Sequence, residues 1–558
     1  MPELPSDASR PHASGGAAGP VVLFLLLIFA AAIGVRVYHV TDPLLEFHVT
    51  RQYRSAVIAR GLYLPYDTAM PAWAREIAVM NADQGELEPT IIEHLAMYGY
   101  RIAGGEHLWI GRLVSIAGWL IGGAAIWLTA LRMMSAIGAL SAVMVFLLVP
   151  YGVLASRSFQ PDALMTAATA VAILQIVRFG QSVRFGSFGS LGSLGSRGAT
   201  AELCAAIVAT AIAAFIKPMS LFFTFGCFAA VVWPVRSGQD GGDGEDASWM
   251  AALRSRLFSW QTWAFLLLSI VPMAAYYAYG LFVTGKMQEQ AGGRFLPELL
   301  LTRFFWSGSW ATAQVVAGWW VWVLAAAGAL MARPGLPRRL FVGFWGAYLL
   351  FGVVFTYHFA THDYYHLPAL IILALGVGAA VARIEAAAGR MSDGRYQRAA
   401  TVAAAILILL TAGVWLQRSA KTLEARDGSA KLAVYERIGN LLHHSQRTIM
   451  LAHDYGMPLR YHGHLTGPSW PSAGDLAAAE LGAGAGAADD SAWSSDVSSA
   501  ERRFNEFYKD RSPEYFLITD FDSFAEQPDL KEFLDTKFVQ LAHEDDFIIY
   551  DLRPKGRS

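Results

Sequence analysis

The sequence predicts an α-helical polytopic membrane protein with about eleven transmembrane helices and a C-terminal α/β domain. Three observations predict this class. Of the 558 residues, 54% are hydrophobic and only 16% are charged, against roughly 25% in soluble domains. Apolar runs of about 20 residues recur along most of the chain. The residues after 417 instead alternate helical and strand-like patterns.

Each of the apolar runs is long enough to cross a bilayer as a helix. They occupy residues 21–40, 108–131, 136–155, 161–179, 200–216, 218–235, 261–284, 314–332, 339–357, 365–383 and 399–417. The first run follows a polar tail, residues 1–20. Because no small-residue cleavage site follows the run, it predicts a membrane anchor and not a removed signal peptide.

Arginine positions predict the orientation, because short cytoplasmic loops carry an excess of Lys and Arg. With a cytoplasmic N-terminus, arginine clusters at 178–197, 236–256, 333–339 and 390–398 all fall inside. We therefore expect a multi-pass protein of the inner (plasma) membrane, in contact with membrane lipids. Its transmembrane domain, residues 21–417, is expected to carry a first outer loop at 41–107. A periplasmic α/β domain, residues 418–558, is expected to follow it.

The first outer loop has two helical segments. From about Phe47 a helical period places Val49, Tyr53 and Val57 on one face, which predicts an amphipathic helix along the membrane surface. A second amphipathic helix is expected after the acidic "GELEP". Two inner segments, 186–198 and 237–246, have the Gly-rich composition of flexible linkers.

The C-terminal residues predict one helix over 428–444 and strands at 447–454, 514–520 and 547–552. Residues 477–496 have the composition of a variable insert. The polar and aromatic segment His453–Leu465 suits contact with a sugar, and it equally suits an ordinary surface loop.

Charged and polar side chains gather at the ends of helices that this topology places outside. They are Asp42, Glu46, Arg51, Gln52, Glu88, Arg157, Asp162, Lys217, His362, Asp363 and Tyr364. Asp162 alone is equally well explained as a first-turn carboxylate that the helix dipole favours. The convergence of carboxylates and cations on one side predicts a polar, partly dry cavity. Such a cavity suits an anionic lipid phosphate and a carboxylate base. The net charge of −2 gives no indication of nucleic-acid binding.

At these residues the chain resembles the GT-C superfamily of membrane glycosyltransferases. It is most similar to bacterial relatives of the dolichyl-phosphate-mannose protein mannosyltransferases and of the lipid A aminoarabinose transferase. The resemblance covers about residues 20–380. It rests on the first loop with its surface helices, "PDALM" at 161–165, the pair Lys217-Pro218 and "HDYYHLP" at 362–368.

The resemblance implies a reaction in which a sugar on a polyprenyl phosphate is transferred to a lipid, glycan or protein acceptor at the outer face, with inversion of the anomeric carbon. Many relatives carry an Asp-Glu pair where the first surface helix begins, but Arg51 and Gln52 stand there in this chain. A subgroup with Arg-Gln has an acid-Pro step near Glu88.

The implied roles follow from this departure. Glu88 is favoured as the base, ahead of Asp42 and Glu46, and Asp162 is a supporting carboxylate. The candidates for binding substrate are Arg51, Gln52, Arg157, Lys217, His362, Asp363 and Tyr364, with Arg51, Arg157 and Lys217 on the donor phosphate.

Other interpretations stay open. His358, His362 and His366 are four apart, as zinc ligands on a helix can be, but Pro368 interrupts that helix. No metal site is therefore assigned, and participation of a divalent cation is left open. Tyr364 and Tyr365 also suit anchoring at the membrane interface. Two other functions, a transporter and a non-catalytic scaffold, each with an outer sensing domain, remain alternatives, although no repeat relates the two halves of the chain.

Overall fold

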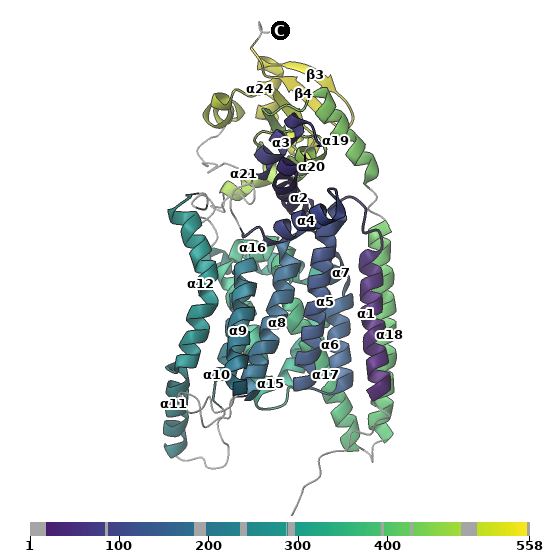
Figure 1. Ribbon diagram of the computed structural model, residues 1–558, viewed down its shortest axis with the longest axis vertical. Coiled ribbons are helices and arrows are strands. Elements are labelled where there is room, and N and C mark those ends of the chain that lie inside the picture. Colours follow the sequence, from purple (N-terminus) through teal and green to yellow (C-terminus); the bar gives the residue numbers. More distant parts are fainter. Residues whose placement is uncertain are drawn as a thin grey trace, which may run out of the picture.

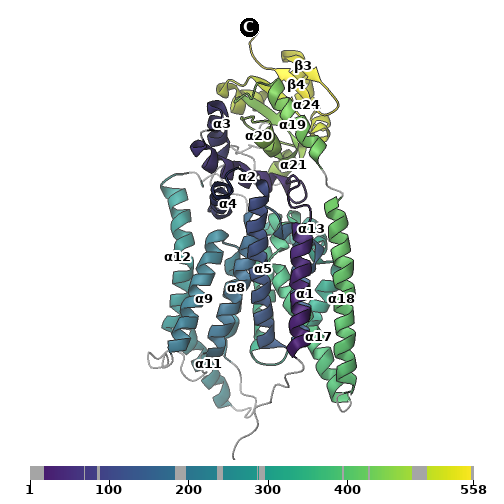
Figure 2. The same cartoon turned by 45° about the vertical axis from the view of Figure 1, so that its right-hand side comes forward.

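The computed structural model describes residues 18–67, 69–83, 88–182, 197–234, 243–285, 287, 296–391, 395–424, 428–480 and 499–554. The predicted class is confirmed. A bundle of long helices forms one end of the molecule, and a small α/β domain stands on the other (Figure 1). The first loop lies between the two, at the same end of the bundle as the C-terminal domain (Figure 2). The predicted linkers at 186–198 and 237–246 and the predicted insert at 477–496 lie largely outside the described residues.

Among the described residues, seven helices are long and apolar enough to cross a membrane, or up to nine if each of two bent pairs is one span. The seven contain α1 (Ala18–Val37), α5 (Leu108–Met133), α8 (Pro161–Ser182), α9 (Arg197–Ile216), α12 (Trp260–Phe282, preceded by α11, Asp243–Leu257), α17 (Ala369–Met391) and α18 (Arg395–Glu424). The predicted spans at 218–235 and 339–357 are also helical, as α10 (Ser220–Val232) and α15 (Leu336–Val354).

Two predicted spans are broken. The run at 136–155 forms α6 (Ala136–Leu148) and α7 (Pro150–Ser156), which meet at 56°. Pro150 explains this break, because a proline disfavours the helical conformation of the residue before it. The run at 314–332 lies across the junction of α13 (Arg303–Ala317) and α14 (Trp319–Leu330), which meet at 90°. Gly318 stands between them with φ 72° and ψ 146°, a conformation that favours glycine.

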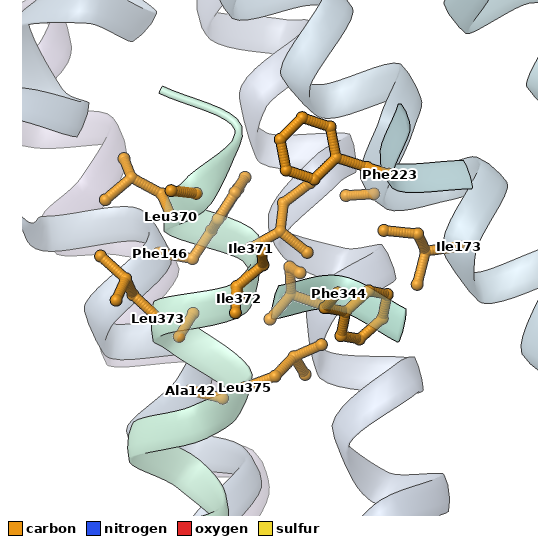
Figure 3. Packing of buried hydrophobic residues seen from close by; sticks show 14 of the residues in the cluster. Ala142, Phe146, Ile173, Phe223, Phe344, Leu370, Ile371, Ile372, Leu373 and Leu375 are labelled. Carbon is orange, nitrogen blue, oxygen red and sulfur yellow. The ribbon is translucent and has the colours of Figure 1, made fainter. Parts of the chain in front are cut away.

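Small residues let the membrane helices approach closely, as is usual where helices pack in lipid. A Cβ on Gly226 of α10 would lie 2.5 Å from the carbonyl oxygen of Gly343 of α15, and a Cβ on Gly138 of α6 would lie 2.6 Å from that of Gly378 of α17. Around these contacts, α17 is buried along most of its length by aliphatic and aromatic side chains (Figure 3). The bundle therefore supplies a rigid frame for the loops at its ends.

The first loop contains the two predicted helices, α2 (Val49–Tyr63) and α4 (Ile91–Ala103), together with η1 (Leu64–Tyr66) and the unpredicted α3 (Ala72–Ala82). The apolar face predicted for α2 does not lie on lipid. Its Tyr53 and Val57 are buried in a cluster with residues of α4 and of α20 (Met457–His462) in the C-terminal domain. The helix is thus held between the bundle and that domain.

The C-terminal domain has a four-stranded sheet in the order β1-β2-β4-β3. Strand β1 (Thr448–Leu451) pairs in parallel with β2 (Tyr515–Ile518), and β4 (Ile548–Asp551) is antiparallel to β2 and to β3 (Val539–His543). The predicted helix over 428–444 is confirmed as α19 (Ser429–Leu441), and three predicted strands are β1, β2 and β4. The remaining elements are η5 (His453–Gly456), α20 (Met457–His462), α21 (Ala473–Glu480), α22 (Ala500–Arg503), η6 (Phe504–Tyr508), η7 (Lys509–Arg511), α23 (Phe521–Ala525) and α24 (Pro528–Lys537).

Asn81 of α3 fastens this domain to the first loop. Its amide nitrogen donates to the carbonyl oxygens of Arg460 and Leu465 at 3.3 and 3.0 Å, and its oxygen accepts from the hydroxyl of Thr466 at 3.0 Å. The hydroxyl of Tyr53 adds a hydrogen bond of 2.9 Å to His462. These contacts place the C-terminal domain directly over the first loop.

Candidate active site

Two carboxylates and two cations from four separate segments form one ion-pair network. The Nζ of Lys217 lies 2.8 Å from Glu88 Oε1 and 2.7 Å from Asp162 Oδ1. The guanidinium of Arg51 lies 3.2 Å from Glu88 and 3.1 Å from Asp162. The structure therefore brings together four of the residues predicted from the sequence, and we call them the outer network.

Local sequence explains where each member stands. Asp162 follows Pro161, a residue favoured at the start of a helix, so its carboxylate lies in the first turn of α8, where the helix dipole favours negative charge. Pro218 follows Lys217 and ends α9 at the same end of the bundle. Glu88 precedes Pro89 just before α4, and Arg51 lies in the first turn of α2.

The outer network is largely withdrawn from solvent. Asp162 is 1% exposed, Lys217 3% and Glu88 8%, whereas the side chain of Arg51 is 17% exposed and provides the most open edge. Burial acts to raise the pKa of Glu88, but the charges of Lys217 and Arg51 outweigh it and hold that pKa well below its usual value. Glu88 is therefore ionised at neutral pH.

The ring of Tyr364 connects the outer network to a neighbouring pair. Arg51 lies over this ring at 4.9 Å from its centroid and Lys217 at 5.5 Å, which are cation–π distances. His48 packs edge-on against the same ring at 4.9 Å. The Nε2 of His48 in turn lies 2.6 Å from the Oδ1 of Asp363. Tyr364 and Asp363, both predicted, are thus part of the same site.

Two residues near the Tyr364 ring have shifted pKa values. Burial, assisted by the charge of Arg51, lowers the pKa of His362 to about 4, so this imidazole is neutral at pH 7. Burial acts to raise the pKa of Asp363, but the hydrogen bond with His48 outweighs it and lowers that pKa. His48 was given no role in the sequence interpretation, although it stands only three residues before Arg51.

Glu46 and Arg157 have structural partners outside the outer network. Glu46 is paired with Arg112 of α5 at 2.5 Å and with Arg157 at 3.4 Å. Arg157 also donates to the carbonyl oxygens of Tyr38 and His39 at 2.7 and 2.6 Å. The role predicted for Arg157 on phosphate and the reserve role of Glu46 as base therefore have no support in the geometry, because both side chains hold the start of the first loop. Arg112, which completes this cluster, was not predicted.

Two further candidates also lie outside the outer network. Gln52 is fully buried, donates to the carbonyl oxygen of Phe47 at 2.6 Å and accepts from the amide of Phe159 at 3.0 Å. Asp42 pairs with His39 at 2.8 Å on a partly exposed edge of the loop. The hydrogen bonds of Gln52 thus give it a structural role in the first loop. The carboxylate of Asp42 contacts a histidine of its own turn and not the outer network.

The three histidines spaced four apart do not form a common cluster. His366 is fully buried and bonded to the hydroxyls of Tyr348 and Thr312 at 2.6 and 2.8 Å, as expected of a structural histidine. Within the described ranges, no group of three or more His, Cys, Asp or Glu side chains is arranged to hold a metal ion. Between Glu88 and Asp162, the positive charges are those of Lys217 and Arg51.

One family model matches part of the chain. Residues 88–233 match the family model of the dolichyl-phosphate-mannose-protein mannosyltransferases. This segment contains Glu88, Asp162 and Lys217, three of the four members of the outer network. No curated protein sequence matches the chain.

Three solved structures are similar over most of this chain. ArnT from Cupriavidus metallidurans, bound to undecaprenyl phosphate, is 14% identical with a TM-score of 0.49, covering 97% of this chain and 99% of that one. The oligosaccharyltransferase AglB from Archaeoglobus fulgidus is 12% identical with a TM-score of 0.49, covering 90% and 70%. The mycobacterial arabinofuranosyltransferase AftD is 13% identical with a TM-score of 0.49, covering 95% and 40%.

The chain is a multi-pass membrane protein, as its long apolar helices require. Over residues 88–233 the family match confirms the resemblance to the dolichyl-phosphate-mannose-protein mannosyltransferases, and so to the GT-C glycosyltransferases, that the sequence motifs predicted.

Proposed function

We propose that the chain is a membrane glycosyltransferase that moves a sugar from a polyprenyl phosphate to a lipid, glycan or protein acceptor of the cell envelope. The reaction takes place at the periplasmic face of the inner membrane, with the N-terminus in the cytoplasm. The transmembrane domain, residues 21–417, binds the donor, and the domain at 418–558 covers the site. The observation that carries this proposal is the outer network, which joins two cations to two carboxylates at one end of the bundle.

Arg51 and Lys217 suit the donor phosphate. A polyprenyl phosphosugar is a phosphodiester with one negative charge, and the leaving polyprenyl phosphate gains a second as the bond to the sugar breaks. Cations fixed beside the phosphate stabilise that developing charge more than they stabilise the bound donor. The partly exposed guanidinium of Arg51 offers two donors to phosphate oxygens, whereas Lys217 offers a point charge.

Glu88 is suited to take the proton of the acceptor. In a single inverting step, the acceptor oxygen forms a bond to the anomeric carbon from the side opposite the phosphate, and its proton goes to a carboxylate. The lowered pKa of Glu88 keeps the carboxylate ready but weakly basic. When Arg51 and Lys217 turn to the donor phosphate, Glu88 loses part of their charge and its pKa rises. Donor binding therefore strengthens the base. Asp162 keeps Lys217 in place.

The C-terminal domain suits a role in placing the acceptor. Asp454, in the segment His453–Leu465, accepts a hydrogen bond of 3.2 Å from Thr50, the residue before Arg51. This contact and the Tyr53–His462 bond bring the predicted sugar-contacting segment next to the first turn of α2.

The test is a transfer assay with the full-length protein in sealed, inside-out and right-side-out membrane vesicles. Each preparation receives radiolabelled undecaprenyl phosphate carrying one of a panel of hexoses and pentoses, together with a cell-envelope extract as the source of acceptor. We expect label in an extract component only where the donor meets the periplasmic face, and none with Glu88→Gln. Movement of label across the membrane without transfer would identify a transporter. A wild-type protein inactive with the whole panel would refute the proposal.

A further inference from the structure

Gln160 is a buried glutamine whose amide has no partner in the protein. It is 0% exposed, and neither its Oε1 nor its Nε2 has a hydrogen-bond partner among the residues that the structure describes. The amide offers two N–H donors and an oxygen with two lone pairs. Exchanging the positions of its oxygen and nitrogen leaves both without a partner, because neither position has one. Buried polar side chains are normally satisfied, and one that is not requires an explanation.

The segment around Gln160 is firmly held. The carbonyl oxygen of Ser158 accepts from the hydroxyl of Ser115 at 2.6 Å, and the amide of Phe159 donates to Gln52 at 3.0 Å. Pro161 then begins α8. A glutamine kept in such a segment has little freedom to turn to solvent, so its position is fixed before any ligand arrives.

Gln160 also lies close along the chain to one member of the outer network. Only Pro161 separates it from Asp162, so the two Cα atoms are at most about 7 Å apart. Two other buried polar atoms without a hydrogen-bond partner among the described residues occur on the same segments, namely the Nε of Arg51 and the Oγ of Ser220, three residues after Lys217. Unsatisfied hydrogen-bonding capacity is thus also present on segments where the proposed donor binds.

The chemistry of the amide selects the class of partner. A phosphate oxygen only accepts, so it would satisfy the N–H groups and leave the carbonyl oxygen unpaired. A hydroxyl donates and accepts, and a pair of neighbouring hydroxyls satisfies both ends of a primary amide. Sugars carry such pairs.

We propose that Gln160 is a specificity-determining residue that binds hydroxyl groups of the transferred sugar while the outer network binds its phosphate. This inference rests on the proposed transfer reaction. It assigns to Gln160 a contact with the sugar and not with the phosphate, the lipid chain or the acceptor.

The test compares Gln160→Met, which keeps length and removes the amide, with the wild-type protein. We expect the thermal unfolding midpoint of the variant to stay unchanged or rise, because no protein hydrogen bond is lost. Its kcat/KM for the donor that the panel identifies should fall about 10- to 100-fold, because that donor loses its polar partner. Binding of undecaprenyl phosphate alone, measured by thermal shift, should be unchanged.

Gln261→Met is the matched control. Gln261 is likewise buried at 4% exposure with an unpartnered Oε1, but it lies in the first turn of α12, at the opposite end of the bundle from the outer network (Figure 1). Its replacement should leave transfer unchanged. Equal transfer by Gln160→Met and the wild type would overturn the inference, and a lower midpoint with lost transfer would make Gln160 structural. Weaker binding of undecaprenyl phosphate would move the contact from sugar to phosphate.

Failure of the two proposals can be told apart. A wild-type protein that transfers no sugar refutes the proposed function. The inference is then decided by thermal shifts with undecaprenyl phosphate mannose and undecaprenyl phosphate. If the two lipids give the same difference in midpoint for Gln160→Met as for the wild type, Gln160 does not contact the sugar.

Discussion

The Nζ of Lys217 lies 2.7 Å from the Oδ1 of Asp162, although the two residues are 55 positions apart and come from the ends of different helices. Both side chains are almost fully buried. A buried charge is tolerated when it is paired, and removal of one partner leaves the other uncompensated. Since Lys217 also pairs with Glu88, removal of the Lys217 charge should weaken the stabilisation of both carboxylates.

Lys217→Gln should move the acid limb of the pH profile of kcat/KM upward. Glu88 must be ionised to act as a base, and Lys217 is the main charge that lowers its pKa against the opposing effect of burial. Without that charge the pKa rises, so protonation abolishes activity at a higher pH, by about one unit or more. Lys217→Arg keeps the charge and serves as the control. An unchanged acid limb in Lys217→Gln would show that Glu88 is not the base.

Glu88→Gln should lower activity, whereas Glu46→Gln should lower stability. The first removes the proposed base and should lower kcat about 10²- to 10⁴-fold, with little change in unfolding. The second leaves Arg112 buried at 0% exposure without its counter-charge. It should lower the free energy of unfolding by about 3 kcal/mol or more, with the folded fraction still active. Thermal unfolding and transfer are measured on the same preparations. The reverse pattern would make Glu46 the base.

Tyr364→Phe should behave like the wild type, whereas Tyr364→Leu should bind undecaprenyl phosphate about 2- to 30-fold more weakly. The phenylalanine keeps the aromatic face over which Arg51 and Lys217 lie, and the leucine removes it. Titration of purified protein with undecaprenyl phosphate measures the effect. Equal loss in both variants would assign the role to the hydroxyl and not to the ring.

That Arg51, Glu88, Asp162 and Lys217 share one end of the bundle could be predicted from the sequence, because hydropathy and arginine positions assign each helix end to one side or the other without knowledge of packing. Which cation meets which carboxylate could not be predicted in the same way. Arg157 and Arg51 look alike in sequence, but one donates to backbone carbonyls of Tyr38 and His39 and the other to Glu88.

Other features left weaker signals. Arg112 lies in the first turns of a membrane helix. Because a charged side chain in the membrane costs free energy, an arginine at this position indicates that it has a buried partner. Pro150 marked the break of the span at 136–155. Strand β3 is five residues long and mostly exposed, so its pairing with β4 depends on tertiary context.

Transfer should not depend on a divalent cation. The ammonium of Lys217 lies between Glu88 and Asp162 at 2.8 and 2.7 Å, so these carboxylates already hold a positive charge where a metal ion would bind. Membranes washed with an excess of EDTA and assayed in its presence should keep their activity. Loss of transfer that magnesium or manganese restores would contradict this assignment. Lys217→Gln, in contrast, should gain a response to magnesium, because it removes one of the two cations that pair with both carboxylates.

Asn81→Ala should weaken the hold of the C-terminal domain on the first loop. Asn81 is 2% exposed and makes three hydrogen bonds to the segment 460–466, so its loss should lower the free energy of unfolding by about 2 kcal/mol. If the domain places the acceptor, KM for the acceptor rises several-fold while KM for the donor is unchanged. Asn505→Ala, at an exposed position of the same domain, is the control. An equal rise in both KM values would mean that the domain supports the donor site itself.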